Sequence, residues 1–348
     1  MSSWEGLKII SGRGLGPVDL FIVVGGSTRT STIEGISIAG PSPEATLYTP
    51  TLDLEYLATG KPVTLPVIPV SPEGLPTPAV VTRSSLSLTR HPILLVDSGL
   101  AHRLKVPGVV IPSSRTGGRI DVEPAFEEGV GERIYRESYT LGETLFRGRG
   151  VMIGETIPGG TTTAAAVMEA LGVEGVDLVS SSSRDNPREL KRRVIGKALE
   201  RARRCGDVFC IIDSLGDPVH VSISGMAAAA LDNGVSVYLA GGTQMGGVLA
   251  ILDSLGYDTG RVAIVTTRWI VEDGGITVIA DRFKAGLVAA WISFSDSPHK
   301  GLRMYDEGYV KEGVGAGGAM ALALSAGYKP GEVKNAVYRE YERLTGSG

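Results

Sequence analysis

Cysteine is scarce in this 348-residue chain, which contains only Cys205 and Cys210. Neither cysteine has a metal-binding spacing with any histidine, and Cys210 lies within an apolar run. We therefore expect Cys210 to pack in the core. A chain with so few cysteines is typical of a reducing compartment, so the sequence predicts reduced thiols and a cytoplasmic location.

Histidine is also rare, and its four residues, His91, His102, His220 and His299, are dispersed. No H-x-x-x-H or H-x-x-E pair occurs, so the spacing gives no support for a metal site. The G-x-S-x-G pattern of serine hydrolases is absent as well. We expect a protein that works without a metal ion or another cofactor.

Long apolar runs and strong charge clusters are missing too. No uncharged apolar run reaches about 18 residues and no signal peptide opens the chain, so we expect no membrane span. Lys and Arg number 34 against 38 Asp and Glu, and basic residues gather only at 191–193 and 201–204. Such short clusters are typical of solvated helix faces, and we expect no nucleic-acid partner.

Side-chain amides are scarce as well, with asparagine only at 186, 233 and 335 and glutamine only at 244. Depletion of these thermolabile residues is a feature of thermophilic proteins. The composition therefore indicates a thermophilic origin.

Apolar runs of strand length alternate with amphipathic segments of helix length. The runs occupy residues 20–24, 93–96, 151–153, 176–179, 208–212, 235–239 and 262–265. The helical segments occupy residues 162–171, 187–204, 222–233, 245–255 and 330–345. This alternation is typical of parallel sheets covered on both sides. We predict an α/β fold, a Rossmann-like, mainly parallel sheet with helices on both faces and a smaller part from the N- and C-terminal segments.

We expect residues 1–348 to form a single unit. Within it, residues 1–145 form an N-terminal part, 146–325 a core that carries the motifs described below, and 326–348 a C-terminal docking helix. Residues 41–82 are rich in Pro, Thr and Gly. The sequence predicts an irregular segment there, which serves either as a lid or as an excursion between domains.

Ligands of open parallel sheets bind beyond the carboxyl ends of the strands. Small and polar residues follow the predicted strands at 25–27, 97–99, Glu155, 180–183, 213–214, 240–243 and 266–267. These strand ends are the candidate ligand contacts.

The most informative motif covers residues 151–171, where an apolar strand ends at Glu155 and a Pro-Gly-Gly turn and three threonines precede a helix. Gly159 and Gly160 allow a tight turn, and the threonines are suited to capping the helix start. A helix start of this kind binds anions, most often phosphate. The alternative is a tight strand–helix turn without a ligand.

A nucleoside-triphosphate loop is the obvious rival. The G-x-x-x-x-G spacing from Gly154 is met, but Gly160 stands where such loops have lysine. A single phosphate held by backbone amides therefore fits this motif better than a triphosphate.

A second motif at residues 306–324 repeats this logic, with Glu312 before a glycine run and an Ala/Leu helix. No strand precedes the run, so a dinucleotide-binding fold is not indicated. The small residues allow the backbone to approach a flat ligand or a neighbouring helix. The alternative is close helix packing with Glu312 in solvent.

Together the two motifs resemble those of the nicotinate-nucleotide–dimethylbenzimidazole phosphoribosyltransferases of cobalamin synthesis. Gly154-Glu-Thr-Ile-Pro-Gly-Gly-Thr-Thr-Thr163 and Lys311-Glu-Gly-Val-Gly-Ala-Gly-Gly318 are most similar to the archaeal branch, the UPF0284-type proteins, as are Gly35-Ile-Ser-Ile-Ala-Gly40 and Tyr48-Thr-Pro50. Thr161 stands where bacterial members have Asn. The bacterial lysine segment corresponds to residues 183–191, which leaves Arg184, Arg188 and Lys191 as alternatives for contacting phosphate.

The resemblance implies a homodimer that transfers phosphoribose from nicotinate mononucleotide to a benzimidazole-type base. The products are nicotinate and an α-ribazole phosphate, and attack comes from the face opposite the departing nicotinate. The pyridinium leaves without protonation, so the reaction needs no general acid. An oxocarbenium-like transition state is stabilised by nearby carboxylates. Glu312 is expected to accept the proton of the incoming base, while Glu155 orients the base or supports the cationic centre.

The predicted catalytic residues are thus Glu312 and Glu155. The predicted phosphate and nucleotide contacts are Gly159, Gly160, Thr161, Thr162, Thr163, Ser180, Ser181, Lys191, Gly241, Gly242, Gly313 and Gly315. Two alternatives stay open: a related phosphoribosyltransferase or phosphorylase acting on another base, and a non-catalytic nucleotide-binding protein.

Overall fold

The computed structural model describes residues 5–346, so the outermost residues of the expected end segments, 1–4 and 347–348, lie outside the described residues. The strands are β1 (Gly6–Ser11), β2 (Leu20–Gly25), β3 (Ile93–Asp97), β4 (Val109–Val110), β5 (Gly150–Thr156), β6 (Ser236–Ala240), β7 (Val262–Thr267) and β8 (Gly286–Trp291). The helices are α1 (Thr49–Thr59), α2 (Pro78–Thr89), α3 (Val130–Leu145), α4 (Gly160–Ala170), α5 (Arg188–Ala202), α6 (Val208–Leu215), α7 (Pro218–Asp232), α8 (Met245–Ser254), α9 (Arg268–Glu272), α10 (Gly275–Arg282), α11 (Lys300–Arg303), α12 (Ala316–Ser325) and α13 (Pro330–Thr345).

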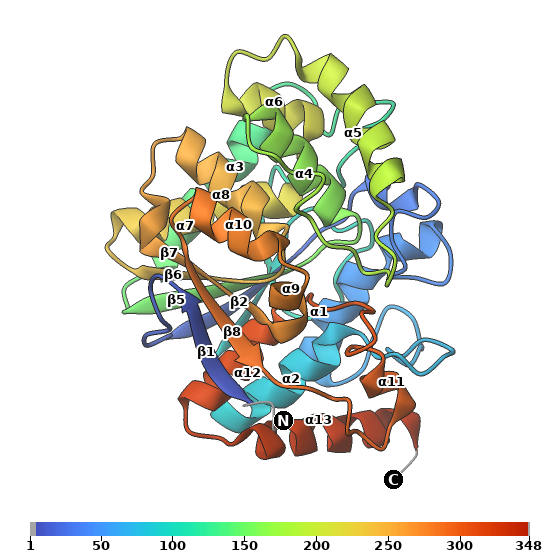
Figure 1. The fold of residues 1–348 in the computed structure, drawn as a ribbon. Helices are drawn as coiled ribbons and strands as arrows, with labels where there is room; N and C mark the ends of the chain where they lie inside the picture. The colour runs from blue at the N-terminus through green and yellow to red at the C-terminus, as the bar shows by residue number, and fades with distance from the viewer. Residues whose placement is uncertain (1–4, 347–348) are drawn as a thin grey trace.

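The strands form one sheet in the order β1-β8-β7-β6-β5-β2-β3-β4. Each neighbouring pair is parallel except β1 with β8, which is antiparallel. Helices α3 to α8 and α10 lie on one side of the sheet, and α1, α2, α12 and α13 lie on the other (Figure 1). The predicted fold class is confirmed.

Both faces of the sheet are buried, which explains why its strands have continuous apolar sequences. Along β2, Ile22 and Val24 belong to the core shared with α3 to α8, whereas Phe21 and Val23 belong to the core shared with α1, α2, α12 and α13. Successive side chains of a strand point to opposite faces, so one apolar run serves two cores.

The direction in which strands are added to the sheet reverses between β2 and β5. From β2 the chain adds β3 and β4 on one side, and from β5 it adds β6, β7 and β8 on the other. A crevice at the carboxyl ends of the strands is expected at such a topological switch point. Glu155 is the penultimate residue of β5 and therefore lies at this position.

Two predicted strands are wrong. Residues 208–212 begin helix α6, because Asp207 caps it by accepting hydrogen bonds from the backbone N–H of Phe209 and Cys210, each at 2.9 Å. A short apolar run fits a buried strand or a buried helix equally well, and here the cap decides. Residues 176–179 form a turn after α4 and join no strand.

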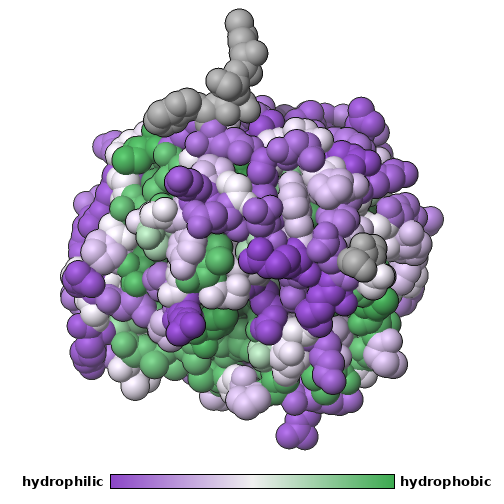
Figure 2. Space-filling model, turned by 90° about the horizontal axis from the view of Figure 1, so that it is seen from below, coloured by the Kyte–Doolittle hydropathy of each residue, from purple (hydrophilic) through white to green (hydrophobic). Residues whose placement is uncertain are grey.

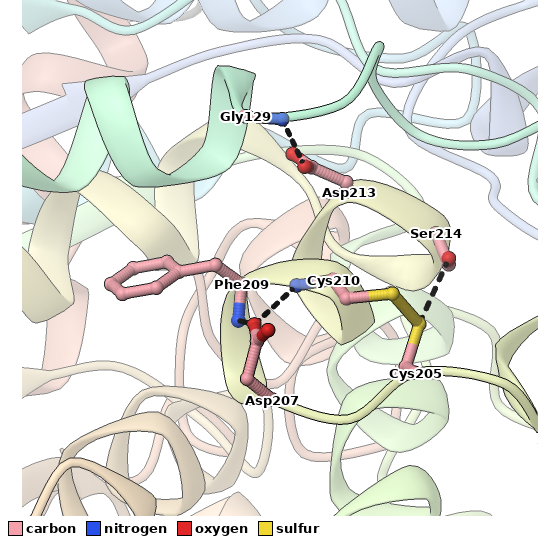
Figure 3. The surroundings of a disulfide bond; sticks show 7 residues. All are labelled: Gly129, Cys205, Asp207, Phe209, Cys210, Asp213 and Ser214. Atoms are coloured by element: carbon pink, nitrogen blue, oxygen red, sulfur yellow. Dashed lines mark hydrogen bonds between the residues drawn. A yellow bond between two sulfur atoms is a disulfide. The ribbon is translucent and has the colours of Figure 1, made fainter.

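The prediction of reduced cysteines is also wrong. Cys205 and Cys210 form a disulfide with a Cα–Cα distance of 5.3 Å (Figure 3). Both residues are only partly buried, so Cys210 is not a core residue. Because α6 is helical, Cys210 lies in its first turn and is brought near Cys205, just before the helix.

Residues 41–82 are not irregular throughout, since they contain α1 and the start of α2. Each of these helices has proline in its first turn, at Pro50 and Pro78, where the missing N–H costs no intrahelical bond. Proline was therefore a helix-start signal here. Strands β1, β4 and β8 and helices α3, α9, α10 and α11 form where no element was expected.

The helix expected at residues 330–345 is confirmed as α13. Val333, Val337 and Tyr341 are buried in the core that includes α2 and α12. Hydrophilic residues cover most of the face seen from below, on which α13 lies (Figure 2). Within residues 5–346, no helix is both long enough and apolar enough to cross a membrane.

Candidate active site

A cavity of about 770 Å³ lies at the carboxyl ends of β5 and β6, beside the switch point. Its wall contains Glu155 and Glu312, which are 157 residues apart in the sequence. The other predicted contacts that line it are Gly159, Gly160, Thr161, Ser180, Ser181, Gly242 and Gly313. The fold therefore brings both glutamate motifs into one cavity.

Glu155 is a buried carboxyl group that belongs to none of the ion pairs among residues 5–346. Its side chain is 1% exposed, and Oε1 has no hydrogen-bond partner among the described residues. Burial, and secondly the charge of Glu312, raise the pKa of Glu155 well above its ordinary value. The cavity environment therefore favours the neutral form of Glu155.

Glu312 lies in a strained loop. Val310, Lys311 and Val314 have φ values of 60°, 56° and 54°, a left-handed conformation that is unfavourable for valine. Backbone strain of this kind persists only where the surrounding structure enforces it, and it is common at functional sites. The loop turns the partly buried Glu312 carboxylate toward the cavity. A Glu312 side chain in solvent, the alternative that the sequence left open, is therefore not what the structure shows.

The Glu312 carboxylate also caps helix α12. Oε1 accepts hydrogen bonds from the backbone N–H of Gly313 and Gly317, both at 3.1 Å, and Oε2 accepts one from Thr266 Oγ1 at 3.4 Å. Burial raises the pKa of Glu312 to about 7 in spite of these donors. A carboxylate with this pKa is matched to accepting a proton near neutral pH.

The two glutamate motifs are joined directly. The backbone N–H of Val314 donates a hydrogen bond of 2.7 Å to the carbonyl oxygen of Glu155. A Cβ on Gly154 would lie 3.0 Å from the Cα of Gly315, so a larger residue would separate the two segments. The glycines of both motifs thus permit the close backbone approach that places the two carboxyl groups together.

The turn before α4 is tight, as its glycines suggest. Gly159 is the N-cap with a φ of 82°, and a Cβ there would lie 3.0 Å from the backbone nitrogen of Ser31. No side chain caps α4, so the prediction that the threonines do so is wrong. Thr161 lines the cavity, Thr162 is buried, and Thr163 turns inward to donate a 2.5 Å hydrogen bond to Asp217 Oδ2.

The structure distinguishes the three candidate cations. Arg184 and Arg188 are exposed, whereas Lys191 is fully buried behind the cavity wall. Lys191 Nζ donates hydrogen bonds to Thr161 Oγ1 at 3.1 Å and to the carbonyl oxygen of Ser180 at 2.6 Å. Burial, and secondly the positive charge of Lys311, lower the pKa of Lys191 to about 7.

The remaining predicted contacts lie behind the wall and do not line the cavity. They are Thr162, Thr163, Lys191, Gly241 and Gly315. Asp217, the N-cap of α7, supports this layer: its Oδ2 contacts His220 Nδ1 at 2.6 Å in addition to Thr163. Burial opposes ionisation of Asp217, but His220 and the hydrogen bonds around it lower its pKa below the ordinary value.

The strand-end candidates 213–214 prove to lie in α6. Asp213 Oδ1 and Oδ2 accept hydrogen bonds from the backbone N–H of Gly131 and Gly129, which fixes the start of α3 outside the cavity. Among residues 5–346, no group of three or more His, Cys, Asp or Glu side chains is arranged to hold a metal ion.

Several cavity residues were missed as contacts, among them the polar residues Tyr48, Asp53 and Gln244. Gln244 is the only glutamine in the chain, and this scarcity was the signal that could have marked it. Asp53 lies on α1, in the segment expected to be irregular, so its burial was not foreseeable.

Curated relatives of this chain were found by sequence, although no family profile matches it. A UPF0284 protein of Aeropyrum pernix is 56% identical over 98% of this chain and 95% of its own length. A UPF0284 protein of Pyrococcus furiosus is 46% identical over 93% of this chain and 98% of its own.

Solved structures share the fold at low sequence identity. A nicotinate-nucleotide-dimethylbenzimidazole phosphoribosyltransferase from Thermus thermophilus superposes with a TM-score of 0.62 at 16% identity, covering 94% of this chain and 83% of that one. A second structure, CobT from the same organism, has a TM-score of 0.62 at 15% identity, covering 94% and 84%. The chain therefore belongs to the UPF0284 family and has the fold of these two structures.

Proposed function

We propose that this protein transfers the phosphoribosyl group of nicotinate mononucleotide to a benzimidazole-type base, as a step in assembling the nucleotide loop of cobamides. The observation that carries the proposal is the meeting of Glu155 and Glu312 in one cavity with the turn before α4. The solved structures of the same fold, one of which has this activity in its name, support the choice of reaction.

The phosphate of the nucleotide would lie against the first turn of α4. Backbone N–H groups at a helix start attract anions, and Thr161, Ser180 and Ser181 add hydroxyl groups along the same wall. Lys191 holds Thr161 and the backbone of Ser180 in place and supplies positive charge from behind the wall. A single phosphate needs no further cation.

The C1′–nitrogen bond of the pyridinium breaks, and nicotinate departs with its electron pair. The incoming base forms the new C1′–nitrogen bond from the opposite face. Positive charge on the ribose is stabilised by the carboxyl groups of Glu155 and Glu312. The proton on the second ring nitrogen of the base passes to Glu312, whose pKa of about 7 suits this role.

Incubating the protein with nicotinate mononucleotide and a panel of benzimidazoles and purines tests the proposal, with nicotinate release as the measurement. We expect release only when a base is present, with an α-ribazole phosphate as the second product. Release without any base would indicate a hydrolase, and nucleotide binding without release would indicate a binding protein. We further propose a homodimer, which sedimentation analysis would test.

A further inference from the structure

The cavity wall contains a third buried carboxylate, to which the reaction above assigns no part. Asp53 lies on α1, lines the cavity and is only 5% exposed. Glu73, the fourth acidic residue of the wall, is exposed. None of the ion pairs found among residues 5–346 includes Asp53, so its charge is not neutralised by a cation.

Two threonine hydroxyl groups hold Asp53 in one orientation. Thr77 Oγ1 donates to Oδ1 and Thr156 Oγ1 donates to Oδ2, each at 2.7 Å. A carboxylate oxygen has two acceptor positions, so each oxygen of Asp53 has one left. Burial raises the pKa of Asp53 to about 6, which reflects the cost of keeping this charge away from water. Asp53 is therefore a rigidly held acceptor at the cavity wall that can accept further hydrogen bonds.

Apolar and aromatic side chains line the same cavity as Asp53. They include Tyr48, Leu52, Leu65 and Val67. The Tyr48 ring is stacked on His102, with ring centroids 3.4 Å apart and an interplanar angle of 12°. A flat aromatic ligand that carries a hydrogen-bond donor on its edge would fit apolar side chains beside a fixed acceptor.

We propose that Asp53 selects the incoming base by accepting a hydrogen bond from an amino or hydroxyl substituent on its ring. This inference rests on the function proposed above and names the class of base. A methyl group at the same position would leave the remaining acceptor positions of the buried carboxylate unpaired, and sites built to bind a donor reject such analogues strongly. Glu312 accepts the ring proton, while Asp53 recognises the substituent.

A matched pair of benzimidazoles, one with a hydroxyl group and one with a methyl group at the same ring position, tests the proposal. The KM of each base is measured from nicotinate release, and its Kd for the free protein is measured by calorimetry. We expect the hydroxyl base to have KM and Kd values lower by about tenfold or more in the wild-type protein. In the Asp53→Leu variant this preference should be lost or reversed, because the donor has no acceptor and the methyl group gains an apolar contact.

Asp213→Asn is the matched control, because it alters a buried carboxylate that lies outside the cavity, and it should keep the wild-type preference. If Asp53→Leu does not fold, Asp53→Asn replaces it, and its weaker, neutral acceptor should reduce the preference. An equal preference in wild type and variant, or none in the wild type, would overturn the proposal. If no base releases nicotinate, the proposed function fails, and the two Kd values still decide the role of Asp53.

Discussion

The two glutamate motifs look alike in sequence but differ in what their carboxyl groups do for the fold. Glu155 is the penultimate residue of a regular strand, and its Oε1 has no partner among the described residues. Glu312 lies in a strained loop, and its carboxylate is bonded to the first turn of α12. The Glu155 carboxyl group is therefore free for a ligand, whereas that of Glu312 serves both the ligand and the fold.

The largest effect is expected for Glu312→Gln. Glutamine keeps an oxygen that accepts the N–H of Gly317, so α12 should remain capped, but it does not accept a proton from the base. Loss of a general base costs about 10²- to 10⁴-fold in rate, and we expect kcat for nicotinate release to fall within this range. Nucleotide binding, measured by calorimetry, should survive. Unchanged turnover would contradict the assignment.

Glu155→Gln should have a smaller effect on turnover and the opposite effect on stability. The substitution removes a buried carboxyl group whose ionisation is opposed by burial and by the charge of Glu312, so we expect a Tm equal to or above that of the wild type. Turnover should fall by about tenfold to hundredfold, because one of two groups that stabilise the cationic centre is lost. A lower Tm with unchanged turnover would mean that Glu155 is a structural residue.

Asp217 supports helix α4 from behind the cavity wall, and its substitution should have the next largest effect. Asp217→Asn weakens the bond from Thr163 that holds α4 against α7, as well as the contact with His220 inside α7. We expect the KM for nicotinate mononucleotide to rise roughly tenfold, since a buried charged hydrogen bond is lost, while kcat changes less. The KM for the base is the internal control. A change confined to kcat would contradict this positioning role.

The smallest effect is a dependence of stability on pH. Because burial raises the pKa of Glu312 from 4.5 to about 7, the folded protein holds a proton there that the unfolded chain releases. This contribution is complete below about pH 4.5 and is lost as the pH rises through 7. Urea unfolding at a series of pH values should show that Glu312→Gln gains stability relative to the wild type over this interval. A constant difference would show that the folded-state pKa is not raised.

Much of the fold could be predicted from local patterns. The strands β2, β3, β5, β6 and β7 and the helices α4, α5, α7, α8 and α13 follow from apolar periodicity, because each pattern reports burial along one element. The errors occur where periodicity is ambiguous. The run at 208–212 fits a strand or a helix, and Asp207 decides by capping α6. The disulfide follows from that helix, which brings Cys210 near Cys205.

By itself, the sequence determined the candidate groups of the site: two carboxyl groups, a glycine turn before a helix and a glycine run that permits close packing. These are local properties, fixed by residue type and spacing. Only the tertiary structure decided which groups share a cavity, since this depends on the reversal of strand order between β2 and β5 and on the contact between Gly154 and Gly315. The same packing buried Asp53 and Lys191 and shifted their pKa values, because the dielectric environment of a side chain is set by distant segments of the chain.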